Sequence, residues 1–195
     1  MDFLTGKIRP MYVKYLSAAF GSALISSIYG VVDMAMVGQY QGPDGTAALA
    51  VVAPIWNIIY SLGLLMGIGG SVLLSTLRGV SEKNKRQSNE YFTAALIGVA
   101  FLAVLSWLGV VFLDRELLTL FGAEETLLPL ARQYLLPVKV VVPSFLFTQF
   151  LSAFLRNDGN PGLATKAVLF GGVFNVLGDY FFVFTLDMGI MGAGL

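Results

Sequence analysis

The sequence predicts an all-α integral membrane protein, a polytopic bundle of five transmembrane helices followed by the start of a sixth. Only 12% of the 195 residues are charged and 56% are hydrophobic, whereas a soluble domain usually carries about 25% charged residues. The mean hydropathy is +0.77. The charges are also segregated, because residues 45–77 and 91–113 carry none. A charge-free run of about 20 residues is long enough to cross a bilayer as a helix.

The boundaries of the spans follow from turn signals between the apolar runs. Residues 42–45 (Gly-Pro-Asp-Gly) and 157–162 (Asn-Asp-Gly-Asn-Pro-Gly) are typical turn clusters. Residues 116–121 (Glu-Leu-Leu-Thr-Leu-Phe) predict a short interfacial helix, and residues 189–195 predict a sixth span that the chain does not finish. The five complete spans are expected at residues 12–37, 47–77, 91–113, 128–155 and 163–184.

Lysine and arginine alternate between the two sides of the predicted bundle. The segment 39–46 and the residues after 184 carry neither, and the segment 114–127 carries one base against four acids. Basic loops stay on the cytoplasmic side of a membrane. We therefore expect a multi-pass protein of the cell (plasma or inner) membrane with a cytoplasmic N-terminus. The bases on that side are Lys7, Arg9, Lys14, Arg78, Lys83, Lys85, Arg86, Arg156 and Lys166.

The composition excludes several classes of function. The net charge is zero and there is no basic patch, so nucleic acid is not an expected partner. Cysteine and histidine are both absent, which excludes disulfides and thiolate metal sites. Proton chemistry near neutral pH would have to use carboxylates. The lipid bilayer is an expected partner, and no cofactor is expected.

Two carboxylates, Asp33 and Asp179, lie near the outer ends of the first and fifth predicted spans. A charged group at the centre of a span costs roughly 2.5 kcal/mol or more, and such groups are retained mainly for function. Asn175 precedes Asp179 by four residues, which places both on one helix face. If the two spans pack together, these side chains could form a site for a hard monovalent cation, or a carboxyl pair that shares a proton. The simpler interpretation is that each carboxylate reaches the outer water and that Asn175 joins two helices.

Lys139 is the third charge inside a predicted span. The simplest interpretation is that its long side chain extends to the outer interface. The alternative is an ion pair with Asp33 or Asp179, which would lower the proton affinity of that carboxylate.

Glycines and prolines predict the shapes of the helices. Gly63 and Gly67 form a small-xxx-small pair, which allows close packing of two helices. Prolines inside spans favour bends, and we expect them at Pro54, Pro137 and Pro143.

Several sequence blocks resemble, in order, the N-terminal half of MATE transporters, the multidrug and toxic compound extrusion family. The first resembles the family's Y-N-x-V-D…x-G-Q pattern. The blocks are residues 29–33 (Tyr-Gly-Val-Val-Asp) with 37–39 (Val-Gly-Gln), 47–50 (Ala-Ala-Leu-Ala) with Pro54, 154–161 (Phe-Leu-Arg-Asn-Asp-Gly-Asn-Pro), and Asn175 with Asp179 and residues 189–194.

The resemblance implies a twelve-helix transporter of two six-helix lobes, of which this chain is the N-terminal lobe and the C-terminal lobe is missing. It implies the exchange of an inward-moving H⁺ or Na⁺ for an outward-moving organic, often cationic, compound. It also implies that Asp33, Asn175 and Asp179 form the cation site. Gln149 and Tyr29 are candidates for the same polar network or the substrate cavity. Many members carry a proline where this chain has Ala18, so a proton-driven bend of the first helix is less supported here.

Other functions remain open at this stage. A chain without the second lobe would be a fragment, half of a split transporter, or a truncated lobe that transports nothing. A lipid-linked saccharide flippase of the same superfamily is a second transport hypothesis, although such cavities often carry more bases than Lys139 alone. An intramembrane aspartyl protease is disfavoured, because Val176 replaces the first glycine of its G-x-G-D motif.

Overall fold

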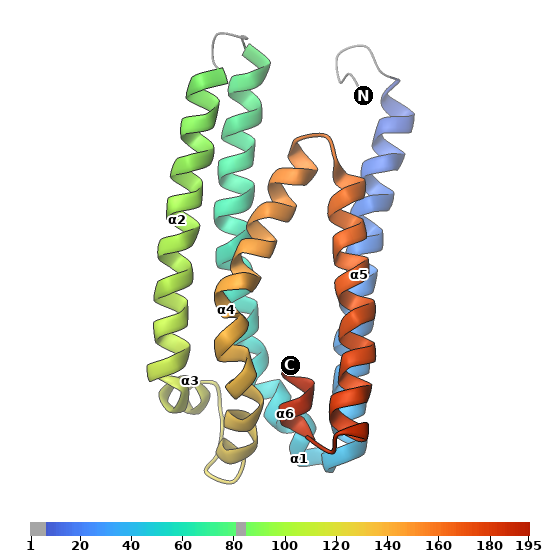
Figure 1. The fold of residues 1–195 in the computed structure, drawn as a ribbon, viewed down its shortest axis with the longest axis vertical. Coiled ribbons are helices and arrows are strands. Elements are labelled where there is room, and N and C mark those ends of the chain that lie inside the picture. Colours follow the sequence, from blue (N-terminus) through green and yellow to red (C-terminus); the bar gives the residue numbers. More distant parts are fainter. Residues whose placement is uncertain (1–6, 81–84) are drawn as a thin grey trace.

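The computed structural model describes residues 7–80 and 85–195 of the chain. In this part the secondary structure is helical and contains no strand, which confirms the predicted all-α class. Figure 1 shows long helices side by side, with the N-terminus at one end of the bundle and α3 at the other. We call the latter the α3 end. The elements are α1 (Ile8–Val80), α2 (Lys85–Phe112), α3 (Asp114–Leu120), α4 (Leu128–Asn157), α5 (Pro161–Tyr180), the π-helical turn η2 (Phe181–Thr185) and α6 (Ile190–Ala193).

The first helix consists of two arms joined at Gly42. The backbone at Gly42 is not helical, with φ 69° and ψ −156°, a region that glycine enters without steric cost. Figure 1 shows the chain reversing direction here, so the arms 8–41 and 43–80 run in opposite directions. The turn is tighter than the predicted cluster 42–45, because Pro43 already belongs to the second arm. Proline is well suited to this place, since its missing N–H costs little at the start of a helix.

The described residues contain four helices that are long and apolar enough to cross a membrane. They are Ile8–Leu77, Asn89–Phe112, Leu128–Asn157 and Pro161–Thr185. Because the first of them reverses at Gly42, they supply the five predicted spans. The short helix expected at 116–121 is α3, and the start of the sixth span is α6.

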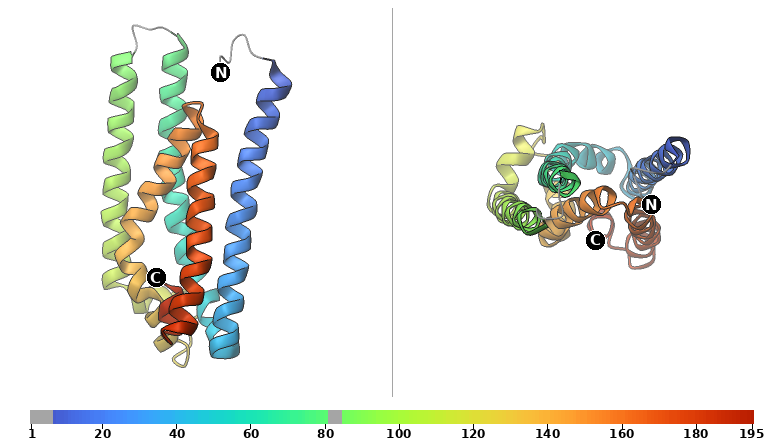
Figure 2. Two further views of the ribbon diagram at one scale, coloured as in Figure 1. Left: turned by 45° about the vertical axis from the view of Figure 1, so that its right-hand side comes forward. Right: turned by 90° about the horizontal axis from the view of Figure 1, so that it is seen from above.

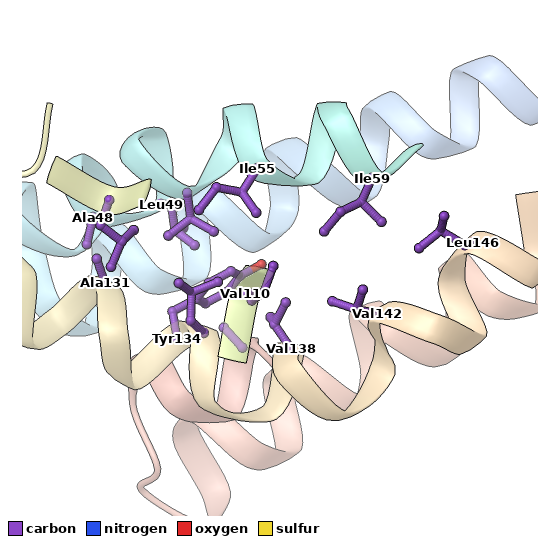
Figure 3. Packing of buried hydrophobic residues seen from close by; sticks show 14 of the residues in the cluster. Ala48, Leu49, Ile55, Ile59, Val110, Ala131, Tyr134, Val138, Val142 and Leu146 are labelled. Carbon is purple, nitrogen blue, oxygen red and sulfur yellow. The ribbon is translucent and has the colours of Figure 1, made fainter. Parts of the chain in front are cut away.

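The core lies where α4 packs against the second arm of α1. Tyr134, Val138, Val142 and Leu146 follow one another at intervals of four residues, so they form one face of α4. Figure 3 shows this row facing Ile59 and its neighbours on the second arm. Val138, Val142 and Leu146 are fully buried. This contact fixes α4 at the centre of the bundle.

Glycines allow the second arm of α1 to approach α4 closely. A Cβ atom added at Gly63 would lie 2.9 Å from the Cβ of Gln149, and one added at Gly67 would lie 2.8 Å from the Cβ of Ala153. Real Cβ atoms almost never come so close. The predicted close packing at Gly63 and Gly67 is therefore confirmed, and its partner is α4.

Proline shapes α4. Pro137 and Pro143 both lie inside the helix, and each removes a backbone hydrogen bond and clashes with the preceding turn. Figures 1 and 2 show α4 bending along its length. Pro54 lies inside the second arm of α1.

Part of the evidence for orientation falls outside the described residues. Lys83 lies in the omitted segment 81–84, and the side chains of Arg78, Lys85 and Arg86 are also outside the description. The cytoplasmic N-terminus therefore stays a prediction from the sequence.

Candidate cation-binding site

The first arm of α1 and α5, which carry the predicted site residues, lie side by side (Figures 1 and 2). Two contacts hold the pair of helices together. Thr165 Oγ1 donates a hydrogen bond to the Ala18 carbonyl at 3.0 Å, and Gly172 packs against Ile25 without room for a Cβ. Asp33 is contributed by the first arm, and the other two predicted site residues are contributed by α5.

Asn175 and Asp179 form a hydrogen-bonded pair one helical turn apart. Asn175 Nδ2 donates to Asp179 Oδ1 at 3.3 Å, as the i,i+4 spacing predicts. Asp179 is only 2% exposed. The carboxylates of Asp33 and Asp179 lie near enough to repel each other when both are charged. The structure therefore brings all three predicted residues into one region.

Three oxygens of this cluster are buried and accept no hydrogen bond from the described residues. They are Oδ1 of Asp33, Oδ1 of Asn175 and Oδ2 of Asp179. A buried polar oxygen without a partner is costly, and a buried charge without a partner costs more. A proton shared between the carboxyls, or a monovalent cation among the oxygens, would supply the missing partner and would remove the repulsion between Asp33 and Asp179.

Tyr134 belongs to the same region and was not predicted. Its side chain is buried, and the side chain of Trp56 lies close to it. It also lies within electrostatic range of Asp33, Asp179 and Tyr29. In the sequence, Tyr134 is one more apolar residue on the buried face of α4. The only available signal was that a buried tyrosine hydroxyl usually needs a polar partner.

Tyr29 and Gln149 occupy different places. Tyr29 packs against Gly172 of α5, with a ring carbon 3.4 Å from an added Cβ, and it lies near Tyr134. Gln149 packs against Gly63. It is 15 residues beyond Tyr134 on α4, which corresponds to roughly 22 Å along a helix.

Lys139 bonds to neither of the predicted carboxylates. Its Nζ donates to Asp114 Oδ2 at 2.7 Å, and Arg132 Nε donates to the same oxygen at 3.0 Å. The ion pair with Asp33 or Asp179 that the sequence left open is therefore not the one that forms. The side chain instead extends to the α3 end, because the start of α3 places a buried carboxylate there.

Asp114 is accordingly held in its charged form. Burial raises the pKa of its carboxyl, but the hydrogen bonds from Lys139, Arg132 and the Arg115 backbone, together with the positive charge of Lys139, lower it by more. The pKa is therefore below its ordinary value, and the bridge ties α3 to α4.

The family model MatE matches residues 18–181. The chain belongs to the MATE family. The resemblance found in the sequence is thereby confirmed.

Individual relatives agree with this MATE assignment. The chain is 27% identical over 173 residues to "Multidrug export protein MepA" of Staphylococcus saprophyticus, covering 89% of this chain and 38% of the relative. It superposes with a TM-score of 0.90 and 27% identity on the MATE multidrug transporter DinF-BH, solved in complex with R6G, covering 99% of this chain and 43% of that one. A MATE transporter of the MOP superfamily, solved in an outward-facing conformation, has a TM-score of 0.83 and shares 23% identity, covering 93% of this chain and 40% of that one. The last likeness supports the fold alone.

The chain spans about 38% of the length of the curated relatives it matches. What those relatives do as whole proteins therefore reaches this chain only as a proposal.

Proposed function

We propose that this chain is the cation-coupling lobe of a multidrug exporter in the cell membrane. The complete transporter exchanges an inward-moving H⁺ or Na⁺ for an outward-moving organic, often cationic, compound. The observation that carries the proposal is the group of three buried oxygens without hydrogen-bond partners on Asp33, Asn175 and Asp179. Membership of the MATE family and the names of the relatives, which are multidrug export proteins and transporters, support efflux as the process.

The coupling ion acts by changing the charge of the Asp33–Asp179 pair. When the pair is empty and charged, its repulsion and its desolvation cost favour any arrangement that separates the carboxylates or admits water. Binding of a proton or Na⁺ removes both costs and favours the compact packing of α5 against the first arm. Since the substrate and the cation prefer different arrangements, each lowers the affinity for the other.

The orientation belongs to the same proposal. The positive-inside bias puts the N-terminus in the cytoplasm and the α3 end outside. Asp33 and Asp179 then lie in the outer half of the bundle, so the cation enters from outside and leaves to the cytoplasm. A transporter role, without enzymatic activity and without a cofactor, accounts for the presence of Asp33, Asn175 and Asp179 in this bundle.

An efflux assay tests the proposal in the complete two-lobe transporter that carries this chain. Asp33→Asn and Asp179→Asn each remove one negative charge while preserving size, and each is expected to reduce gradient-driven export of a fluorescent organic cation at least tenfold. Asp44→Asn is the matched control, because Asp44 is an exposed acid on the same helix. Export that survives both substitutions unchanged would exclude the assigned site.

Collapsing one gradient at a time identifies the ion. A protonophore stops export if the coupling ion is H⁺, whereas removal of external Na⁺ stops it if the ion is Na⁺. Export that is indifferent to both gradients would contradict coupled antiport.

A further inference from the structure

A bridge joins the first arm of α1 to the segment that follows α5. The hydroxyl of Tyr40 donates a hydrogen bond to Oδ1 of Asp187. The Tyr40 ring also covers Gly189, where an added Cβ would lie 2.7 Å from a ring carbon. It contacts the ring of Phe184 edge-on, with centroids 6.1 Å apart. We call this contact the Tyr40–Asp187 bridge.

The bridge lies beyond the carboxylate pair, toward the α3 end. Tyr40 follows Asp33 by seven residues, which is two helical turns on the same face and roughly 10 Å along the axis. On the neighbouring segment, Asp187 lies beyond η2 and follows Asp179 of α5 by eight residues. The bridge therefore lies closer to the α3 end than the two carboxylates do.

Two valines fill the space between the carboxylates and the bridge. Val37 is one turn beyond Asp33, and Val183 is four residues beyond Asp179. Both are 0% exposed and belong to the same hydrophobic cluster. Toward the α3 end, the first arm of α1 thus carries a carboxylate, a buried valine and a bridge residue in this order. The segment from α5 through η2 carries the same order. Two buried apolar side chains therefore lie between the carboxylates and the bridge along the chain.

The segment on the far side of the bridge has unusual backbone geometry. Asp187 is the one non-glycine residue of the described chain with a positive φ, 55°. Gly189, two residues later, has φ 57°. The preceding residues Phe181–Thr185 form a π-helical turn. The positive φ of Asp187 and the π-helical turn are unfavourable alone and persist only where surrounding contacts hold them, whereas Gly189 adopts its conformation without steric cost. The contact of Tyr40 with Asp187 and Gly189 is such a restraint, so its release allows this segment to relax.

We propose that the Tyr40–Asp187 bridge is a gate that closes the Asp33–Asp179 pair to water at the α3 end of the bundle. With the bridge formed, Val37 and Val183 stay in contact with the cluster and separate the carboxylates from the aqueous side. With the bridge broken, the segment after η2 moves away from the first arm and opens a path for the cation. The identity of that cation rests on the proposed function, but the gating of water does not.

The absence of cysteine from the sequence permits a direct test of access. Asp33→Cys places one thiol at the inner side of the gate in the full chain inserted in sealed membrane vesicles. The measured quantity is the rate of its modification by a charged, membrane-impermeant methanethiosulfonate, added to each side of the membrane in turn. Asn175→Cys is a second reporter on the opposite helix, and it carries the test if Asp33→Cys does not insert.

Tyr40→Phe removes the hydroxyl while leaving the ring over Gly189. We expect it to raise the modification rate from the α3 side by roughly two- to tenfold, which corresponds to the loss of one typical solvent-exposed hydrogen bond. The rate from the other side is expected to stay unchanged. Asp187→Asn, which weakens the acceptor, should produce a smaller increase in the same direction. Tyr180→Phe is the matched control, since Tyr180 also contacts Phe184 but is 60% exposed, and it should leave the rate unaltered.

Equal modification rates in the parent, Tyr40→Phe and Asp187→Asn forms of both reporters would overturn the gate. An equal increase from both sides would also overturn it, since that indicates general loosening of the bundle. Neither outcome depends on transport. The gate can therefore fail while Asp33→Asn still abolishes export, and it can hold even if the export assay refutes the proposed function.

Discussion

Gly67 and Gly69 offer a matched pair that tests how closely the second arm of α1 must approach α4. The two glycines lie in the same helix, two residues apart, and face different surroundings. A Cβ added at Gly67 would lie 2.8 Å from the Cβ of Ala153 and 3.0 Å from the Cα of Phe150, whereas one added at Gly69 meets nothing within 4 Å. Gly67→Ala therefore forces the two helices apart, and Gly69→Ala does not.

The expected magnitudes follow from two opposing terms. Replacing glycine by alanine inside a helix stabilises it by roughly 0.5–1 kcal/mol at either position. At Gly67 the added methyl group also overpacks a contact with backbone, which typically costs about 1–3 kcal/mol. Ordinary carbon contacts lie at about 3.5–4.0 Å, so the helices have to separate by most of an ångström unless the bundle repacks. The helix-propensity term cancels in the difference between the two variants, which should be about 1–3 kcal/mol.

Thermal unfolding of the purified chain in one detergent measures this difference. The Gly69→Ala variant should melt at the parent temperature or slightly above, and the Gly67→Ala variant several degrees below it. Equal melting temperatures for the two variants would refute the argument that α4 leaves no room at Gly67.

Three further substitutions test other contacts. Asp114→Asn should destabilise the contact between α3 and α4 by about 1–3 kcal/mol, because it leaves Lys139 in an apolar span without its anionic partner. The pKa of Asp114 is lowered in the folded chain. Its stabilisation of the fold is therefore present above the ordinary carboxyl pKa of about 4 and is lost as the pH falls through the lowered value. Acid titration of the melting temperature should show this loss in the parent chain and not in the Asp114→Asn variant. Tyr134→Phe removes a buried hydroxyl beside Trp56, so the tryptophan emission should shift, and an unaltered spectrum would contradict the proximity of the two side chains. Thr165→Val removes the hydrogen bond to the α1 backbone and should lower the free energy of unfolding by about 1 kcal/mol, measured by denaturant titration; no change would indicate that this bond contributes nothing to the pairing of α1 and α5.

The helical spans and the Asn175–Asp179 hydrogen bond were predictable because both depend on local patterns. Charge-free runs predict helices that cross a membrane, and the four-residue interval between Asn175 and Asp179 predicts their hydrogen bond without knowledge of the tertiary fold. Their approach to Asp33 required one assumption, that the first and fifth spans pack together, and the structure has them side by side. The narrow turn at Gly42 was predicted only as a broader cluster, since proline is as common in a loop as at the start of a helix.

The contacts that the sequence did not predict depend on tertiary structure. Asp114 precedes Lys139 by 25 residues, and only the turn through α3 and the N-terminal part of α4 brings them together. Tyr134 lies on the buried face of α4, and its position in the sequence gave no indication that it would approach Asp33, Asp179 and Trp56. Both cases involve a polar group whose partner belongs to a distant segment.

Direct measurement of cation binding to the purified chain tests the central claim most closely. Proton uptake between pH 8 and 5, and binding of radioactive Na⁺ at pH 8, can both be measured in detergent without a substrate or a second lobe. We predict that the parent chain binds a proton or one Na⁺ at the cluster, that Asp33→Asn and Asp179→Asn each abolish this binding, and that Asp44→Asn retains it. Identical binding by the parent and by both site variants would contradict the assignment of Asp33, Asn175 and Asp179 as the coupling site.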